Sequence, residues 1–124
     1  MGYETDATWA INIDVYWQGH AEFVSTPFYP TPIQAGTPFT ITFSFKNTSA
    51  SQDLMWCGLY NNLYPLGNIV TEVDIPGVTC NDDPGTWWEG NLASNGTIAI
   101  TLNFAQGINA PISNYQIRIG HYEP

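Results

Sequence analysis

Basic residues are almost absent from this sequence: Lys46 and Arg118 are the only two, against eleven acidic side chains in 124 residues. The resulting formal net charge of −9 repels the phosphates of nucleic acids and the anionic surface of membranes. Two cationic side chains are also too few to form a basic patch. We therefore expect no nucleic acid and no membrane among the partners, whereas neutral ligands and cations such as calcium fit the charge.

Long apolar runs are absent as well, and no stretch approaches the length of a membrane span. Met1 and Gly2 lead directly into polar residues, without the basic and apolar regions of a signal peptide. Charged residues make up 10% of the chain and hydrophobic residues 44%, a balance opposite to that of disordered chains. Either the protein stays in the cytosol, or this is an excised mature domain. Because the composition is similar to that of extracellular β-domains, we expect the second, a domain of a secreted, extracellular protein.

Helix-favouring residues such as Lys, Glu, Gln, Met and Leu are scarce, while Thr, Ile, Asn, Gly, Pro and aromatic residues are plentiful. Such a composition is typical of strands and turns. The length fits one domain, so we expect a single domain over residues 1–124. Several segments alternate apolar and polar residues with a period of two, as half-buried strands do. The clearest are 8–18, 38–46, 97–104 and 114–122, and weaker strands are expected around 21–25, 53–60, 68–74, 77–80 and 86–90.

Strands that keep one face toward water form antiparallel sheets. Eight or nine such strands, separated by turn residues, predict an all-β fold: a two-sheet antiparallel β-sandwich, immunoglobulin-like or jelly-roll. All six Phe residues are expected in the core. An α/β fold is not expected, because no helical pattern longer than a turn lies between the strands.

The chain has only two cysteines, Cys57 and Cys80. In a secreted domain we expect them to form one disulfide, which would stabilise the fold by roughly 3 kcal/mol through loop closure. The alternative is a pair of buried free thiols. A zinc site built on the cysteines is not expected, because His20 and His121 lack a zinc-finger spacing to them.

Signatures of catalysis are missing too. There is no G-x-S-x-G motif, and the two histidines lie near opposite ends of the chain, without a metal-binding partner at helical spacing. Most acidic residues fall in turns or on the solvent-facing side of predicted strands. A small sandwich also offers little room for the cleft that glycoside hydrolysis requires. We therefore expect a binding protein and not an enzyme.

One acidic cluster is a candidate metal site. Asp82 and Asp83 lie in a loop with Glu89 nearby in the sequence, and loop carboxylates are ligands that calcium prefers. The spacing is not that of an EF-hand, and the Asn-Asp-Asp-Pro-Gly run is also an ordinary turn sequence. We expect no required cofactor, with a structural calcium ion at this loop as the exception that the sequence allows.

Aromatic residues are in surplus, at 15% of the chain. In segment 54–60 the natural register leaves Trp56 and Tyr60 facing water, about 13 Å apart, with Gly58 between them as a gap for an extended ligand. The opposite register would bury Trp56 with Leu54 instead. The inward set in the first register is Met55, Cys57 and Leu59.

Other aromatic residues extend this candidate surface. Trp87 and Trp88 are adjacent, so one of them must point away from the core if the segment is a strand. Large aromatic surface in water usually marks a binding site, and pyranose rings stack on indole and phenol rings while their hydroxyls bond neighbouring polar groups. The predicted carbohydrate-binding residues are Trp56, Tyr60, Trp87, Trp88, Tyr16, Tyr64 and Gln116. Tyr122 shares the outward register of Gln116.

The Trp56-x3-Tyr60 and Trp87-Trp88 motifs, the Thr/Asn-rich strands and the near absence of Lys and Arg resemble carbohydrate-binding modules of plant-cell-wall hydrolases. The chain is similar in size and amino-acid composition to β-glucan-binding sandwich modules, in particular to carbohydrate-binding module family eighty-one. The resemblance implies binding of β-1,4 or mixed-linked β-glucans (cellulose, cello-oligosaccharides, xyloglucan) without catalysis. It also implies a parent glycoside hydrolase, an endoglucanase, in the same polypeptide.

A second resemblance points to another role. Residues 35–47 (AGTPFTITFSFKN) resemble the opening strand of adhesion-type immunoglobulin-like modules in bacterial surface proteins. That resemblance implies a structural or adhesive domain in which the aromatic residues are buried.

Overall fold

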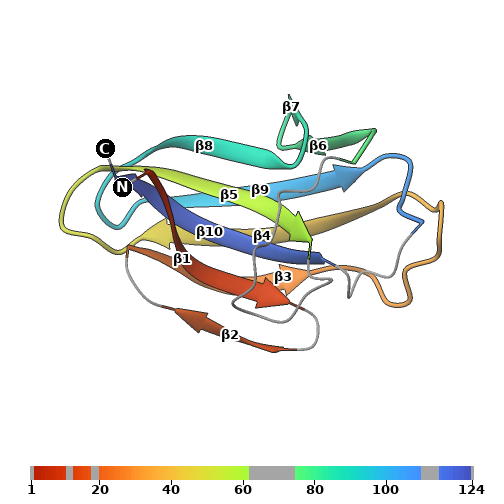
Figure 1. The fold of residues 1–124 in the computed structure, drawn as a ribbon, viewed down its shortest axis with the longest axis horizontal. Helices are drawn as coiled ribbons and strands as arrows, with labels where there is room; N and C mark the ends of the chain where they lie inside the picture. The colour runs from red at the N-terminus through yellow and green to blue at the C-terminus, as the bar shows by residue number, and fades with distance from the viewer. Residues whose placement is uncertain (1, 11–12, 18–19, 62–74, 110–114, 124) are drawn as a thin grey trace.

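A computed structural model describes residues 2–10, 13–17, 20–61, 75–109 and 115–123, with the backbone alone for 8–10, 13–17 and 61. The described chain forms two five-stranded antiparallel sheets, which pack face to face (Figure 1). The predicted all-β, two-sheet antiparallel sandwich is therefore confirmed. The described part of the chain contains no helix long and apolar enough to span a membrane.

The first sheet, called sheet A, carries both ends of the described chain. Its central strand pairs with the N-terminal strand on one side, where Gly2 lies opposite Glu123, so the two termini lie side by side (Figure 1). In spatial order, sheet A contains β2 (Ile13–Trp17), β1 (Gly2–Ala10), β10 (Tyr115–Glu123), β5 (Asp53–Asn61) and β8 (Trp87–Leu92).

The second sheet, called sheet B, contains the strands with the clearest alternation. Residues of β4 and β9 pair without interruption from Phe39 opposite Phe104 to Lys46 opposite Thr97. In spatial order, sheet B contains β3 (Ala21–Phe28), β4 (Phe39–Asn47), β9 (Thr97–Phe104), β6 (Val78–Cys80) and β7 (Asp83–Pro84).

The apolar positions of the alternating segments meet between the sheets. Because side chains on a strand point alternately to its two faces, every second residue of β4 and β9 is buried while its neighbours face water. The rings of Phe39 and Phe104 stack in this core with centroids 4.5 Å apart. Phe28 is the exception to the predicted Phe core: it is 72% exposed, because it lies at the end of the edge strand β3.

The N-terminal segment differs from its predicted form. Residues 8–18 do not make one long strand; β1 and β2 pair with each other as antiparallel neighbours, with Thr8 opposite Tyr16. Alternation with a period of two continues across both strands of a hairpin, so it does not reveal where the chain reverses. The strand expected at 68–74 lies outside the described residues.

The strand order favours the immunoglobulin-like topology over a jelly-roll. Immunoglobulin-like sandwiches place strands A-B-E-D in one sheet and C-F-G in the other. Sheet B reproduces the first order as β3-β4-β9-β6, and sheet A reproduces the second as β5-β10-β1. The N-terminal strand β1 occupies the place of the last strand G, which is why both chain ends meet in one sheet.

Cys57 and Cys80 are buried free thiols, so the predicted disulfide is wrong. They lie on β5 and β6, strands of opposite sheets, and both belong to the buried core. Burial and the neighbouring Cys80 raise the pKa of the Cys57 thiol well above its usual range. The pair therefore packs as two small apolar side chains within the core.

Candidate functional site

The outward register predicted for β5 is confirmed, but the exposure of Trp56 is not. Met55, Cys57 and Leu59 are buried in the core, so Trp56 and Tyr60 lie on the outer face of sheet A. Trp56 is nevertheless only 1% exposed. The prediction of Trp56 as an exposed platform residue is therefore wrong, because other side chains on the same outer face cover it.

Trp56 is the buried base of an aromatic cluster. Gly120 lies opposite it on β10, and a Cβ atom there would come within 2.7 Å of the indole, so glycine provides the space for the ring. The indole Nε1 donates a hydrogen bond to the backbone carbonyl of His121 at 3.0 Å. Both the apolar body and the polar N–H of Trp56 are thus satisfied within the protein.

Trp87 covers Trp56 from β8. The two indoles lie parallel, with planes 4° apart and centroids 4.9 Å apart. Trp87 is placed over Gly58, where an added Cβ atom would lie 2.8 Å from the ring carbon Cε3. Gly58 therefore makes room for Trp87 and not for a ligand, which corrects the expected gap. Trp87 itself is half-buried and keeps part of its surface in contact with water, as predicted for one of the two adjacent tryptophans.

Trp88 is the member of that pair that packs against the core, although it is half-buried like Trp87. It lies opposite Cys57 and packs edge-on against Phe45 of sheet B, with ring centroids 5.9 Å apart. Gly90 leaves space beside it, since a Cβ atom there would lie 2.8 Å from the indole. Trp88 therefore packs against the core, and its predicted binding role stays a prediction.

The exposed part of the cluster contains one residue that the sequence reasoning missed. Tyr3 is 50% exposed, and its ring lies edge-on to Trp56, at 6.3 Å, and to Trp87, at 5.3 Å. Tyr122, opposite Tyr3 on β10, is 36% exposed and contacts it at 4.7 Å. Tyr3 was missed because it precedes the segment whose alternation is visible. We name these five residues the outer aromatic cluster: Tyr3, Trp56, Tyr60, Trp87 and Tyr122.

Charged side chains flank the outer aromatic cluster. The Tyr3 hydroxyl donates to the Glu89 carboxylate, with oxygen separations of 3.2 and 3.3 Å. Burial of the hydroxyl group raises the pKa of Tyr3, and Glu89 raises it further. At the other side, the Arg118 guanidinium lies 4.8 Å from the centroid of the half-buried Tyr60 ring. The cluster therefore has an acceptor group and a donor group at its edges.

Gln116 does not have the exposed position expected of a binding residue. It is 1% exposed, and its side-chain oxygen accepts a hydrogen bond from Arg118 Nε at 2.5 Å. Burial excludes direct ligand contact, so Gln116 supports the position of Arg118. Tyr16 lies on β2 of sheet A, but its side chain, like the whole of Tyr64, is outside the described residues.

Comparisons of the chain with protein-family models, with curated proteins and with solved structures gave no match. The resemblance to carbohydrate-binding modules therefore stays a prediction.

The predicted acidic cluster is divided between the two sheets. Asp82 and Asp83 are exposed at the β6–β7 turn of sheet B, whereas Glu89 lies on β8 of sheet A beside Tyr3. Among the described residues, these three carboxylates do not come together as one metal-binding group. The calcium prediction for this set thus lacks the geometry it needs, because residues close in sequence belong to different sheets.

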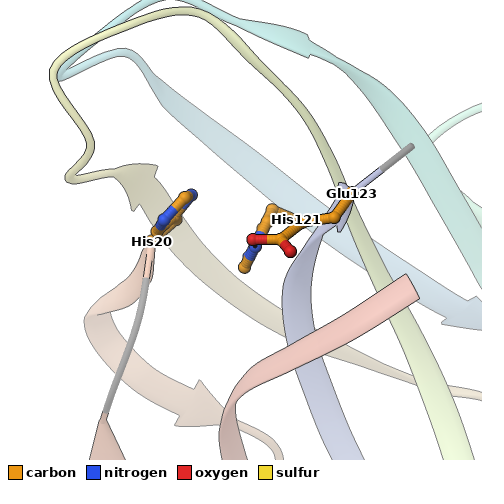
Figure 2. Close-up of side chains that lie close together, drawn as sticks. All are labelled: His20, His121 and Glu123. Atoms are coloured by element: carbon orange, nitrogen blue, oxygen red, sulfur yellow. Dashed lines mark hydrogen bonds and ion pairs between the residues drawn. The ribbon is translucent and has the colours of Figure 1, made fainter. Parts of the chain in front are cut away.

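A second cluster brings together the two histidines of the chain (Figure 2). His20 precedes β3 in sheet B, and His121 lies on β10 in sheet A. Their imidazole rings stack with centroids 3.9 Å apart and planes 18° apart. Glu123 follows on β10 and its carboxylate lies 2.9 Å from His121 Nε2. One potential ligand atom from each of the three residues lies within 4.8 Å of the others.

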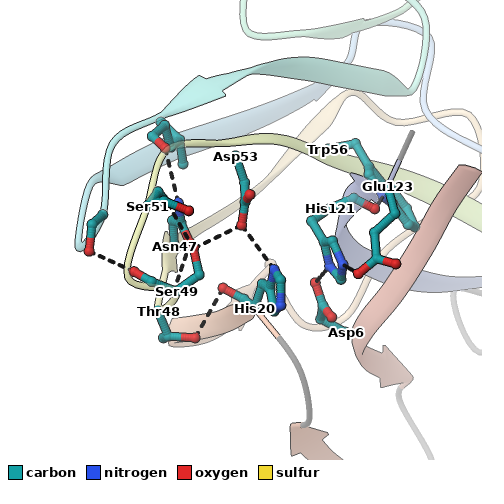
Figure 3. Close-up of polar contacts among 12 residues, drawn as sticks. Asp6, His20, Asn47, Thr48, Ser49, Ser51, Asp53, Trp56, His121 and Glu123 are labelled. Atoms are coloured by element: carbon teal, nitrogen blue, oxygen red, sulfur yellow. Dashed lines mark hydrogen bonds and ion pairs between the residues drawn. The ribbon is translucent and has the colours of Figure 1, made fainter. Parts of the chain in front are cut away.

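Two further carboxylates hold the imidazoles in place (Figure 3). His121 Nδ1 lies 2.7 Å from Asp6, and both side chains are buried, at 6% and 4% exposure. His20 Nδ1 lies 2.9 Å from Asp53. Ser49 Oγ lies 2.8 Å from the same Asp53 oxygen, and its single proton can also go to Asn47 Oδ1 or to the Ser51 carbonyl. In a Ser-His-Asp triad the serine hydroxyl bonds the imidazole, whereas here Ser49 bonds the carboxylate.

The surrounding carboxylates favour positive charge at this cluster. Burial by itself lowers the pKa of His121, but the hydrogen bonds with Asp6 and Glu123 outweigh it and raise the pKa overall. Burial raises the pKa of Asp6, against hydrogen bonds from His121 and the backbone N–H of His20. The bond to His121 lowers the pKa of Glu123.

Sequence reasoning missed this cluster because it tested the histidines at helical spacing only. On a strand, residues two apart share a face, so His121-x-Glu123 was the available signal. The approach of His20 had no signal, since it depends on how the two sheets pack.

Proposed function

We propose that this protein is a non-catalytic module that binds a polysaccharide through the outer aromatic cluster on sheet A. The observation that carries the proposal is a row of contacting rings (Trp87, Tyr3 and Tyr122) that remains partly exposed on one sheet face. Exposed aromatic surface that is gathered in one place usually serves binding. Trp56 is the buried layer that supports this row.

The chemistry of the face suits a neutral sugar chain. Apolar faces of pyranose rings can stack on the indole of Trp87 and on the two tyrosine rings, as apolar ligand surface does on aromatic side chains. Glu89 accepts and Arg118 donates hydrogen bonds at the edges, where sugar hydroxyls would lie. With two basic residues in the chain, an anionic polymer would find little compensating charge.

The substrate class follows from the resemblance to plant-cell-wall modules. We propose β-1,4 or mixed-linked β-glucan chains, including xyloglucan, as the ligand, and a secreted parent glycoside hydrolase as the enzyme that the module brings to its substrate. An open sheet face suits extended chains, because a polymer can enter and leave it sideways. No cofactor is needed for stacking of this kind.

The test is affinity electrophoresis in gels that contain hydroxyethyl cellulose, mixed-linked β-glucan or xyloglucan. The full chain is expected to be retarded by at least one polymer, and Trp87→Ala is expected to remove the retardation. Phe28→Ala is the matched control, because Phe28 is an exposed aromatic residue of sheet B, at 72% exposure. Equal migration of the full chain in all gels, or equal retardation of both variants, would contradict the proposal.

The immunoglobulin-like strand order favours a second candidate, a structural or adhesion domain of a surface protein. In that case the outer aromatic cluster would pack against a neighbouring domain or a protein partner. A full chain that ignores every polysaccharide but loses its partner contact with Trp87→Ala would support this alternative.

A further inference from the structure

We propose that His20, His121 and Glu123 form a binding site for a divalent transition-metal ion, for which zinc is the probe. The site lies at the end of the sandwich where both chain termini meet, and none of its three residues belongs to the outer aromatic cluster. The proposal does not depend on polysaccharide binding, and either one can fail alone.

The ligand set is that of a transition-metal site. Two imidazoles and one carboxylate match the His2Glu sets that hold zinc with an open fourth position. Calcium and magnesium prefer sites made of oxygen ligands alone. Imidazole nitrogen selects zinc, copper or nickel over these hard ions, so the chemistry of the residues decides the class of metal.

The ligand atoms are near one another, and a small movement of the side chains would bring them to the spacing that zinc requires. Tetrahedral zinc with bonds of about 2.0–2.1 Å holds its ligand atoms about 3.3 Å apart. His121 Nε2 and Glu123 Oε1 are already 2.9 Å apart, and all three ligand atoms lie within 4.8 Å. The side chains of His20 and Glu123 are 39% and 50% exposed, so an ion can reach them from water. The buried His121 is the fixed point of the site.

The hydrogen-bond partners of the two imidazoles are also typical of a metal centre. Metal-binding histidines usually bond their other ring nitrogen to a carboxylate, which orients the ring and sets the tautomer. Here Asp6 holds Nδ1 of His121 and Asp53 holds Nδ1 of His20. This leaves Nε2 of each ring as the metal-binding atom. Ser49 Oγ lies within hydrogen-bond distance of Asp53, at 2.8 Å (Figure 3).

The arrangement gives the ion a structural effect. His20 enters from sheet B, while His121 and Glu123 belong to sheet A. An ion bound to all three would connect the two sheets at this end of the sandwich. Because a ligand that binds only the folded state stabilises it, zinc should raise the melting temperature in a concentration-dependent manner.

The test is isothermal titration of the full chain, with any affinity tag removed, by zinc chloride at neutral pH in a non-coordinating buffer. We expect one saturable zinc per chain and a rise in melting temperature, with neither effect from calcium or magnesium. The side-chain NMR signals of both histidines should shift together on zinc addition.

Two variants at exposed positions locate the site without disturbing the core. His20→Gln and Glu123→Gln should each weaken zinc binding at least tenfold while the metal-free melting temperature changes little. The control is Asp82→Asn combined with Asp83→Asn, which removes two exposed carboxylates from sheet B and should leave zinc binding unchanged. Absence of zinc binding by the full chain, or unchanged binding by His20→Gln and Glu123→Gln, would overturn the proposal.

Discussion

The indole of Trp56 lies parallel to that of Trp87 on the outer face of sheet A, with centroids 4.9 Å apart, and one ring buries the other. The partner strands supply glycine beneath each ring: Gly120 beside Trp56 and Gly58 beside Trp87. The cluster is thus built in two layers, with a buried ring that supports a partly exposed one.

Trp87→Ala and Trp88→Ala should differ in their effects on stability and on binding, although the residues are adjacent. Trp88 packs against Phe45 in the core, so its removal leaves a cavity and should lower the free energy of unfolding by about 3–5 kcal/mol. Trp87 is half-buried on the surface, so its removal should cost less stability but abolish retardation by polysaccharide. Urea denaturation and affinity gels measure the two effects. A larger loss of stability for Trp87→Ala would contradict the assignment of faces.

Gly58→Ala should weaken polysaccharide binding without any loss of an aromatic ring. The new methyl group would lie 2.8 Å from Trp87, so the indole must shift on the sheet surface. We expect a loss of about 1–3 kcal/mol in stability from this overpacking, and weaker retardation in the gel. Gly85→Ala, at a position where nothing lies within 4 Å of an added Cβ, provides a comparison for the gel although its φ of +98° adds strain. If Gly58→Ala retains full retardation, the position of Trp87 does not matter for binding.

Gly120→Ala should be among the most destabilising substitutions in the chain. An added Cβ would overlap the Glu4 backbone carbonyl on the neighbouring strand and would come within 2.7 Å of the Trp56 indole. Backbone cannot move aside as a surface side chain can, so we expect a loss of about 4 kcal/mol or more. Thermal denaturation followed by Trp fluorescence measures it. A near-native melting temperature would show that β1 and β10 pair differently in solution.

Reducing agent should leave the stability unchanged, because Cys57 and Cys80 are free thiols in the folded protein. Burial, which raises the pKa of Cys57, should also make native alkylation slow, since the thiolate is the reactive form. Two thiols per chain should react once the protein is unfolded in denaturant without reductant. A melting temperature that falls with reductant would instead indicate a disulfide.

Asp53→Asn should weaken zinc binding about 10–100-fold although Asp53 is not a ligand. The amide replaces the carboxylate that holds His20 Nδ1, so the ring loses its fixed orientation and its preference for one tautomer. Zinc titration measures the change. Asp83→Asn is the control with the same chemical change on the exposed β7 strand of sheet B. Equal zinc affinity for both variants would assign Asp53 a purely structural role.

Much of the fold follows from local pattern. The alternation in β4 and β9 predicted both strands and their buried faces. Successive side chains on a strand point to opposite faces, so every second residue shares a face. The same alternation of side-chain direction placed Trp56 and Tyr60 on the outer face and required Trp87 and Trp88 to point to opposite faces. The alternation did not show that the chain direction reverses between β1 and β2, since the same alternation continues through both strands of a hairpin.

Tertiary structure alone decided which outward residues are exposed and which distant residues meet. Trp56 faces outward by register yet is buried, because the rings of Tyr3 and Trp87 pack against it. Both residues belong to strands that are far from β5 in the sequence. His20 meets His121 only because the start of β3 packs against the end of β10 across the sandwich. Sequence thus determined the faces of the strands, which are a local property. Burial and chemical sites required the sheet order and the packing between sheets, which depend on contacts that no local pattern records.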